Sequence, residues 1–562
     1  MADADVIIIG SGFGGSVTAC RLAQAGAKVL VLERGREWSP SNFPRAPTDP
    51  WIFDANDPLA RHGWFDLRIW PNMTVAAGAG VGGGSLVYAN ISVEAKPDSF
   101  DTGWPAAITY DTLAPYYAEV GRMMEVQRVP RGQWPERTKL LNEAATKAGW
   151  QSRFRPLELA VRFDPAYTYD QADPHDHAKS KTETNIHGVE QGTCVHLGEC
   201  DIGCPVKARN TLDFNYLAVA RKLGVTVLPL HMVRDIRAAA GGFQVIADEI
   251  TATALQPRTF TSSKVIVAAG SIGSTEVMLK ARASGGLGNV SPRLGMGWSS
   301  NGDFLTPAIH PLRNVDPTHG PTITAAIDLL DRTFMGQPVF IEDGGFPNLT
   351  ADAIKRAAAT ASGDDLTARV TKTLLPALQT IDLLRSVMPW FAQSRDAANG
   401  VMSLKKGRLF LDWDITASEA TIDAVVKAHR KLASLTGGVA LTPITWELGR
   451  DLVTPHPLGG CNMGTSAANG VVDSNGQVFG HPGLYVADGA IIPKALGLNP
   501  SRTIAALAEH IAAGLVSLPP ASPTGRVISR PVMSKPAKAK PPARKPKAAK
   551  AQPAKRRRSR AK

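Results

Sequence analysis

"DVIIIGSGFGGSVTACRLAQAGAKVLVLER", from Asp5 to Arg34, is the stretch of sequence that decides the fold. Residues 5–9 are an apolar run typical of a buried strand, and residues 16–24 have the composition of a helix. Residues 27–34 return as a second apolar run. The stretch therefore predicts a βαβ unit, and with it an α/β fold that begins with a parallel sheet.

Three glycines of this unit carry a binding prediction. Gly10, Gly12 and Gly15 match G-x-G-x-x-G between the first strand and the helix, and Glu33 ends the second strand. Such glycines let backbone N–H groups approach a pyrophosphate at a helix N-terminus, and the acid suits a free ribose 2′-hydroxyl. The sequence therefore predicts a Rossmann-like lobe that binds an adenine dinucleotide, with an ordinary tight turn as the alternative.

A second glycine cluster, "GAGVGGGSLVY", follows at residues 78–88 and includes Gly78, Gly83, Gly84 and Ser85. Each glycine costs chain entropy unless the backbone must approach something closely. A flat isoalloxazine ring lying against the main chain is such a partner, which favours FAD over NAD. A second turn packed on the first is the other interpretation.

The remaining elements indicate a lobe assembled from separated segments. Strands are predicted at 225–230, 264–270 and 483–489, and a helix is predicted at 274–283. The FAD-binding lobe is assigned to residues 1–105, 191–305 and 451–520, the last also being catalytic. Residues 106–190 are assigned to a connecting segment of the substrate lobe, and residues 306–450 to an α+β substrate-binding lobe with a mixed or antiparallel sheet.

The basic charge of the chain is concentrated at one end. Of the 62 Lys and Arg, 15 lie in residues 521–562, which contain no Asp or Glu, so residues 1–520 hold 47 basic against 50 acidic side chains. A tail rich in Lys, Pro, Ala and Arg cannot bury enough apolar surface to order itself, and we expect it to be disordered. Weak contact with an anionic membrane or with nucleic acid is one interpretation, and a solvated tail without a partner is the other.

The sequence also bears on location and on metal. The N-terminal "MADADVIIIGSGFGG" is acidic where a signal peptide is basic, and no stretch reaches the ~18 apolar residues of a membrane span. We expect a cytoplasmic protein without a signal peptide, peripheral membrane contact being an alternative. Residues 374–391 are apolar on a helical period and suggest a core helix or an apolar lid. Cys194, Cys200 and Cys204 lack a fourth thiolate nearby, so no metal site is predicted.

Six ordered motifs resemble one known family. They are "IIIGSGFGGS" with Glu33, "GAGVGGGSLVY", "ARNTLDFNYLAVARKLG", "VIVAAGSIGSTEVMLKA", "HPLGGC" and "GLYVADGAIIPKALGLNPSRTIAALAEHI". Together they resemble the glucose-methanol-choline (GMC) family of FAD oxidoreductases. Within it they are most similar to the sterol-oxidising branch, the bacterial cholesterol oxidases with non-covalent FAD.

The resemblance implies roles for particular residues. It places His456 and Asn499 beside the flavin, holding the substrate hydroxyl. It places Val233 beside the adenine through its backbone, and Asp488 with Gly489 beside the ribityl chain and pyrophosphate. Glu342 falls where the family's isomerising base lies, an ordinary loop acid being the alternative. The family's "NPF" reads "NPS" here, at residues 499–501, which bears on the identity of the alcohol.

The chemistry of two of these side chains agrees with those roles. An imidazole with an unperturbed pKa of ~6.5 can accept the proton of a hydroxyl, and an amide can both donate to it and accept from it. Asn499 and Pro500 also read as the N-cap and the first position of a helix that ends near Gly514.

The resulting expectation is oxidation of a sterol-like secondary alcohol to the ketone, with hydride transfer to flavin N5. O₂ or another acceptor would reoxidise the flavin, and double-bond isomerisation to the 4-ene-3-one would follow oxidation. The alternatives are a GMC dehydrogenase acting on another hydrophobic or sugar-like alcohol, and a basic-tailed binding protein whose flavin lobe is structural.

Overall fold

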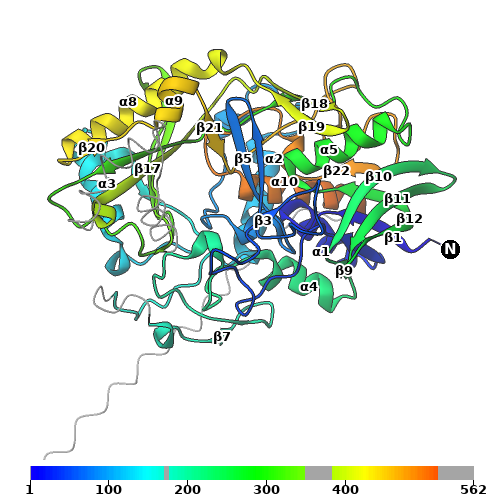
Figure 1. The fold of residues 1–562 in the computed structure, drawn as a ribbon, viewed down its shortest axis with the longest axis horizontal. Coiled ribbons are helices and arrows are strands. Elements are labelled where there is room, and N and C mark those ends of the chain that lie inside the picture. The colour runs from blue at the N-terminus through cyan, green and yellow to red at the C-terminus, as the bar shows by residue number, and fades with distance from the viewer. Residues whose placement is uncertain (1, 170–175, 349–382, 517–562) are drawn as a thin grey trace, which may run out of the picture. The chain divides into compact units, whose positions relative to one another are not determined.

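The computed structural model of the chain describes residues 2–169, 176–348 and 383–516, which form an α/β fold built on two large sheets (Figure 1). In Figure 1 the strands of the first sheet, among them β1 and β10 to β12, lie on the right, and β17 and β20 of the second lie on the left. The predicted tail lies outside the described residues. The domain boundaries assigned above stay predictions.

The first sheet has seven strands and is Rossmann-like. Its strands run β10 (His231–Ala239), β11 (Gly242–Ile250), β12 (Leu255–Val267), β1 (Ala4–Ile9), β2 (Val29–Leu32) and β9 (Thr226–Leu228), and β22 (Leu484–Val486) also pairs with β12. The pairs among β22, β12, β1, β2 and β9 are parallel, whereas β10, β11 and β12 form an antiparallel meander. Strands from three distant parts of the sequence therefore meet in one sheet.

Four helices of the described residues belong to this lobe. They are α1 (Phe13–Gln24), α4 (Tyr216–Lys222), α5 (Gly270–Ala283) and α10 (Ser501–Val516). Helix α1 packs on β1 and β2, and α5 packs on β10. Helix α1 packs against both α4 and α10, and α10 also packs against α2 (Tyr110–Met123). The predicted strands and helices of this lobe are confirmed, with ends that differ by a few residues, except that β12 begins nine residues before the predicted start at Lys264.

The second sheet is antiparallel and has six strands. Their order is β20 (Val439–Ala440), β14 (Phe304–Ile309), β17 (Val387–Ser394), β16 (Gln337–Asp343), β15 (Ala325–Phe334) and β6 (Phe154–Pro156). Helices α8 (Glu419–Leu435) and α3 (Glu136–Lys147) pack on it. The apolar stripe of α8 is buried there, as its amphipathic sequence requires.

Smaller sheets complete the fold. A four-stranded sheet runs β21 (Leu452–Thr454), β5 (Met73–Gly78), β4 (Phe65–Trp70) and β3 (Ile52–Phe53), and β5 lies between the two large sheets in Figure 1. The others are β13 (Met296–Trp298), β18 (Gly400–Lys405) and β19 (Arg408–Asp412) in one sheet and β7 (Glu183–Thr184) with β8 (Glu190–Gln191) in another; α9 is Ile444–Gly449. Within the described ranges, no helix is both long and apolar enough to cross a membrane.

The helical period predicted for residues 374–391 is wrong for its last part. Residues 374–382 lie outside the described residues, but Val387–Ser394 is strand β17, paired with β14 and β16. Trp390 is buried and Phe391 is partly exposed, because successive side chains of a strand face opposite sides. A short apolar run does not distinguish helix from strand, and pairing with two neighbours decides the outcome.

Candidate active site

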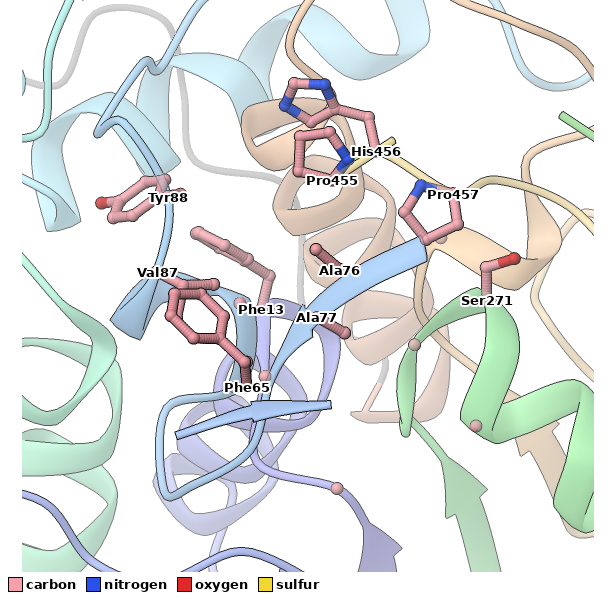
Figure 2. Close-up of a pocket in the computed structure, with 18 of the residues that line it drawn as sticks. Phe13, Phe65, Ala76, Ala77, Val87, Tyr88, Ser271, Pro455, His456 and Pro457 are labelled. Atoms are coloured by element: carbon pink, nitrogen blue, oxygen red, sulfur yellow. The ribbon is translucent and has the colours of Figure 1, made fainter. Parts of the chain in front are cut away.

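A cavity of about 880 Å³ is lined by residues from both large sheets and from the four-stranded sheet. At one end it is lined by glycine turns and by the carboxyl ends of β1, β2 and β12. At the other end apolar side chains line it, namely Ile91, Leu305, Ile323, Phe346, Pro389 and Phe391. Figure 2 shows His456 next to Pro455, with Pro457, Ala76 and Ala77 of β5 nearby and the rings of Phe13, Phe65 and Tyr88 at another side. One continuous space therefore joins the predicted cofactor and substrate regions.

The two glycine clusters meet at the start of α1. Gly83 has φ +52°, and a Cβ added there would lie 2.6 Å from the Cα of Gly12. A Cβ on Gly12 would meet no protein atom nearer than the Cα of Gly83, at 3.9 Å, which is ordinary van der Waals contact. Both glycines line the cavity. The N-terminus of α1 thus faces a cradle of bare main chain, the arrangement that receives a pyrophosphate.

Glu33 joins the loop to the second strand of the unit. Its Oε2 accepts hydrogen bonds from the N–H of Ser11 at 3.0 Å and from its hydroxyl at 2.7 Å, while Oε1 accepts from the N–H of Gly35 at 2.9 Å. The side chain is buried and also lines the cavity. It therefore fixes the shape of the loop as well as standing where a ribose hydroxyl is expected.

Two further predicted cofactor residues line the same end. At Val233 a bulge interrupts the pairing of β10 with β11, which leaves Arg234 without a partner residue in the ladder. The carboxyl of Asp488 accepts hydrogen bonds from the N–H groups of Gly270 and Ala490, both at 2.8 Å, and burial raises its pKa to about 6. These contacts hold the two loops at the carboxyl ends of β12 and β22.

His456 is held by an aspartate that the sequence analysis missed. Its Nδ1 lies 3.0 Å from both carboxylate oxygens of Asp303, which is fully buried. The hydroxyl of Thr454 contacts the same carboxylate at 2.5 Å and accepts a hydrogen bond from the backbone N–H of His456 at 2.9 Å. The imidazole is thereby fixed through Nδ1, and Nε2 is left for the cavity that His456 lines. No local motif could have indicated Asp303.

Asn499 lines the cavity, and Glu342 lies behind it. The Asn499 side chain hydrogen-bonds the Glu342 carboxyl, whose Oε2 also accepts from Nε2 of Gln393 at 2.9 Å. Burial raises the pKa of Glu342 to about 8. The amide oxygen of Asn499 and Oε1 of Glu342 are buried without a hydrogen-bond partner among the described residues. Such orphaned acceptors point to a bound group that is needed to satisfy them.

The start of α10 differs slightly from the prediction. The helix begins at Ser501, and the carbonyl of Pro500 accepts from the N–H of Ile504 at 2.9 Å, so Asn499 stands just outside it. Its side chain turns to Glu342 instead of capping the helix. Asn499, Pro500, Ser501 and Ile504 all line the cavity, so the positive end of the α10 dipole faces the cavity.

Most of the predicted site residues come together in this one cavity. Those that line it are Gly10, Gly12, Glu33, Gly78, Gly83, Gly84, Val233, His456, Asp488, Gly489 and Asn499. Gly15, Ser85 and Glu342 are buried behind the wall. A Cβ on Gly15 would lie 2.0 Å from the carbonyl oxygen of Gly10, and the Ser85 hydroxyl donates to the carbonyl of Gly82 at 2.8 Å. These two residues shape the loops, and Glu342 reaches the cavity through Asn499.

The donor set fits a dinucleotide with a flat ring system. The bare cradle at Gly12 and Gly83, the dipoles of α1 and α10 and the side chain of Asn499, whose amide oxygen is unsatisfied, all border one continuous space. The same observations do not fit a metal: among residues 2–169, 176–348 and 383–516, no group of three or more His, Cys, Asp or Glu side chains could hold one. The five cysteines are free thiols.

Comparison with known proteins gives consistent results. A family model described as GMC oxidoreductase matches residues 397–508, and one described as an NAD(P)-binding Rossmann-like domain matches residues 8–41. The chain is 32% identical to a cholesterol oxidase of Mycobacterium tuberculosis, covering 91% of this chain and 90% of that one. It is 30% identical to a cholesterol oxidase of Acinetobacter baumannii, covering 90% and 93%.

Among solved structures, the fold resembles pyridoxine 4-oxidase from Mesorbium loti. The TM-score is 0.61 at 17% identity, and the match covers 91% of this chain and 99% of that one. At this identity the likeness concerns the fold alone.

Proposed function

Because the chain belongs to the GMC oxidoreductase family, we propose that it oxidises a sterol-like secondary alcohol to the ketone with non-covalently bound FAD. The family and the Rossmann-like domain indicate a flavin cofactor. The observation that carries the proposal is the Asp303–His456 pair in the same cavity as Asn499, at the border between a main-chain cradle and an apolar end. Relatives named cholesterol oxidase support a sterol-like substrate and O₂ as the acceptor.

The flavin, when bound, supplies the hydride acceptor. The residues of the chain accept the hydroxyl proton and orient the alcohol. Asp303 keeps a proton on Nδ1 of His456, so that Nε2 can accept the proton of the substrate hydroxyl. The charge of the resulting imidazolium is balanced by the same carboxylate.

Asn499 orients the hydroxyl from the other side. Its amide stands at the start of α10, and the helix dipole favours negative charge at this place. The apolar end of the cavity excludes water from the rest of the substrate.

Isomerisation of a 5-ene product is the second part of the proposal. Conjugation moves a proton from C4 to C6, which requires a base in an apolar setting. Glu342 has such a setting because it is fully buried and its pKa is raised to about 8. It is joined to the cavity through Asn499. The predicted cytoplasmic location and the tail contact with membrane or nucleic acid stay predictions.

Replacement of Asn499 by Leu tests the arrangement. Asn499→Leu removes the amide while leaving the cradle intact, and we expect the rate of anaerobic flavin reduction by the alcohol to fall by about 100-fold. The FAD content, read from the absorption spectrum, should stay the same. Asn314→Leu, at an exposed position outside the cavity, is the control. An unchanged reduction rate in Asn499→Leu would remove Asn499 from the mechanism.

A further inference from the structure

Asp201 is a further carboxyl in the wall of the active-site cavity, and nothing in the proposed oxidation uses it. It belongs to a short 3₁₀ turn, Cys200–Ile202, that the sequence analysis considered only for its cysteines. Its neighbours in the lining are Ile202, Thr322 and Ile323. An acid among apolar side chains in a substrate cavity requires a physical explanation.

The main chain around Asp201 is firmly held. The indole N–H of the buried Trp64 donates to the carbonyl of Asp201 at 3.1 Å. The guanidinium of Arg45 donates to the carbonyls of Ile202 and Gly203, both at 2.7 Å. The position of the carboxyl is therefore set by the fold, and a ligand would find it preorganised.

The carboxyl itself receives little from the protein. Among the described residues, its hydrogen-bond donor is the Thr322 hydroxyl, 3.3 Å from Oδ1. The guanidinium of Arg209 donates instead to Asn90 and to the carbonyls of Ser85, Leu86 and Tyr88. Both Nη atoms of Arg137 donate to backbone carbonyls. Burial raises the pKa of Asp201 to about 6, although the charges of Arg209 and Arg137 act in the opposite direction.

Asp201 and the reacting end of the cavity lie within reach of one substrate molecule. Thr322, the partner of Asp201, precedes Ala326 by four residues, and Ala326 is paired with Glu342 behind Asn499. Four residues span at most about 14 Å of extended chain. Between Thr322 and Ala326, Ile323 lines the cavity and gives this part of the wall an apolar side chain.

We propose that Asp201 is a substrate-recognition residue that accepts a hydrogen bond from a second donor, a hydroxyl or an amine, at the end of the substrate remote from the oxidised alcohol. This inference rests on the proposed function and predicts a preference within its substrate class, for elongated, mostly apolar alcohols that carry a second polar group. Among the described residues the carboxyl of Asp201 accepts one long hydrogen bond, from Thr322, so it can accept another from the substrate donor.

Three matched substrates test the inference in the FAD-bound enzyme. They are 3β-hydroxysteroids that carry at C17 a hydrogen, a hydroxyl or an amine, and kcat/KM is measured for each. We expect the wild-type enzyme to favour the hydroxyl and amine compounds by about 10-fold or more.

In Asp201→Leu the preference should vanish for both compounds. The isosteric Asp201→Asn should keep the hydroxyl preference and lose the amine preference, because it retains an acceptor without a charge. Asp213→Asn, at a buried carboxyl that does not line the cavity, should keep the wild-type ratios.

Two results would overturn the assignment: equal kcat/KM for the three steroids in the wild-type enzyme, or an undiminished preference in Asp201→Leu. If none of the steroids reduces the flavin, the proposed function fails. The role of Asp201 is then decided by dissociation constants of the same steroids, measured from quenching of protein fluorescence. Tighter binding of the C17-substituted compounds that Asp201→Leu abolishes would support the inference, and equal constants would refute it.

Discussion

At the scale of single residues, the account depends on how His456 is held. The motif around His456 is visible in the sequence, but its partner Asp303 lies 153 positions away, and no spacing rule connects the two. The fold brings the two together because His456 follows β21 and Asp303 immediately precedes β14, and these two segments lie side by side. Sequence reasoning could therefore find the base and not the residue that sets its tautomer.

Asp303→Asn should lower the rate of flavin reduction by about 100-fold or more. The amide keeps the shape of the carboxylate but not its charge, so the imidazolium that forms on proton transfer loses its stabilisation. Stopped-flow reduction under anaerobic conditions measures the effect, with the flavin spectrum as a check on cofactor content. A rate within twofold of the wild-type value would show that Asp303 has no part in positioning the base.

Glu342 gives a pH dependence with a definite sign. A base acts as the carboxylate, and the pKa of Glu342 is raised by burial from 4.5 to about 8, so conjugation of the double bond should accelerate as the pH rises toward 8. Because the folded-state pKa is the higher one, the same ionisation should reduce the free energy of unfolding as the pH rises from about 4.5 to 8.

The measurement is the ratio of conjugated to non-conjugated ketone over this pH range. Glu342→Gln should still oxidise the alcohol and should release the non-conjugated ketone. A variant that conjugates the double bond at the wild-type rate would leave Glu342 as a structural acid.

At the scale of elements, local patterns predicted the dinucleotide unit and failed in the antiparallel sheet. Strand β1, helix α1 and strand β2 follow one another within about thirty residues, so a local sequence pattern is enough to predict them. Strand β17 is extended because it pairs with β14 and β16, which are distant in sequence. Its apolar residues fit either period, and only the pairing decides between them.

The start of α1 provides a test at this scale. Gly12→Ala introduces a Cβ that no protein atom crowds, since the nearest, the Cα of Gly83, is 3.9 Å away. We expect the variant to fold with a normal melting temperature and to lose most of its FAD, because the methyl group occupies the cradle. Gly132→Ala, with no atom within 4 Å and outside the cavity, is the matched control and should keep its FAD.

Gly14→Ala differs from Gly12→Ala, because its Cβ would clash with the protein itself, 1.6 Å from the carbonyl oxygen of Ala487. It should lower the melting temperature through a clash within the protein. Full FAD content in Gly12→Ala would contradict the assignment of the cradle.

At the scale of the whole molecule, function arises where two sheets meet. The parallel sheet presents glycine turns and helix N-termini, and the antiparallel sheet presents an apolar wall with Glu342 behind it. The sequence motifs predicted the glycine turns of the first side, and on the second side the family resemblance indicated Glu342 but not the apolar wall. The order of the antiparallel strands, in which β6 from residues 154–156 joins strands from residues 304–440, could not be predicted, because it depends on contacts between distant segments.

The central claim is that this cavity holds a flavin which a sterol-like alcohol reduces. The most direct measurement is the absorption spectrum of the purified protein during anaerobic addition of cholesterol. The account predicts a yellow protein whose flavin absorption bleaches in proportion to the added sterol and returns when an electron acceptor is admitted. A flavin that stays oxidised with cholesterol but bleaches with a sugar alcohol would contradict the account.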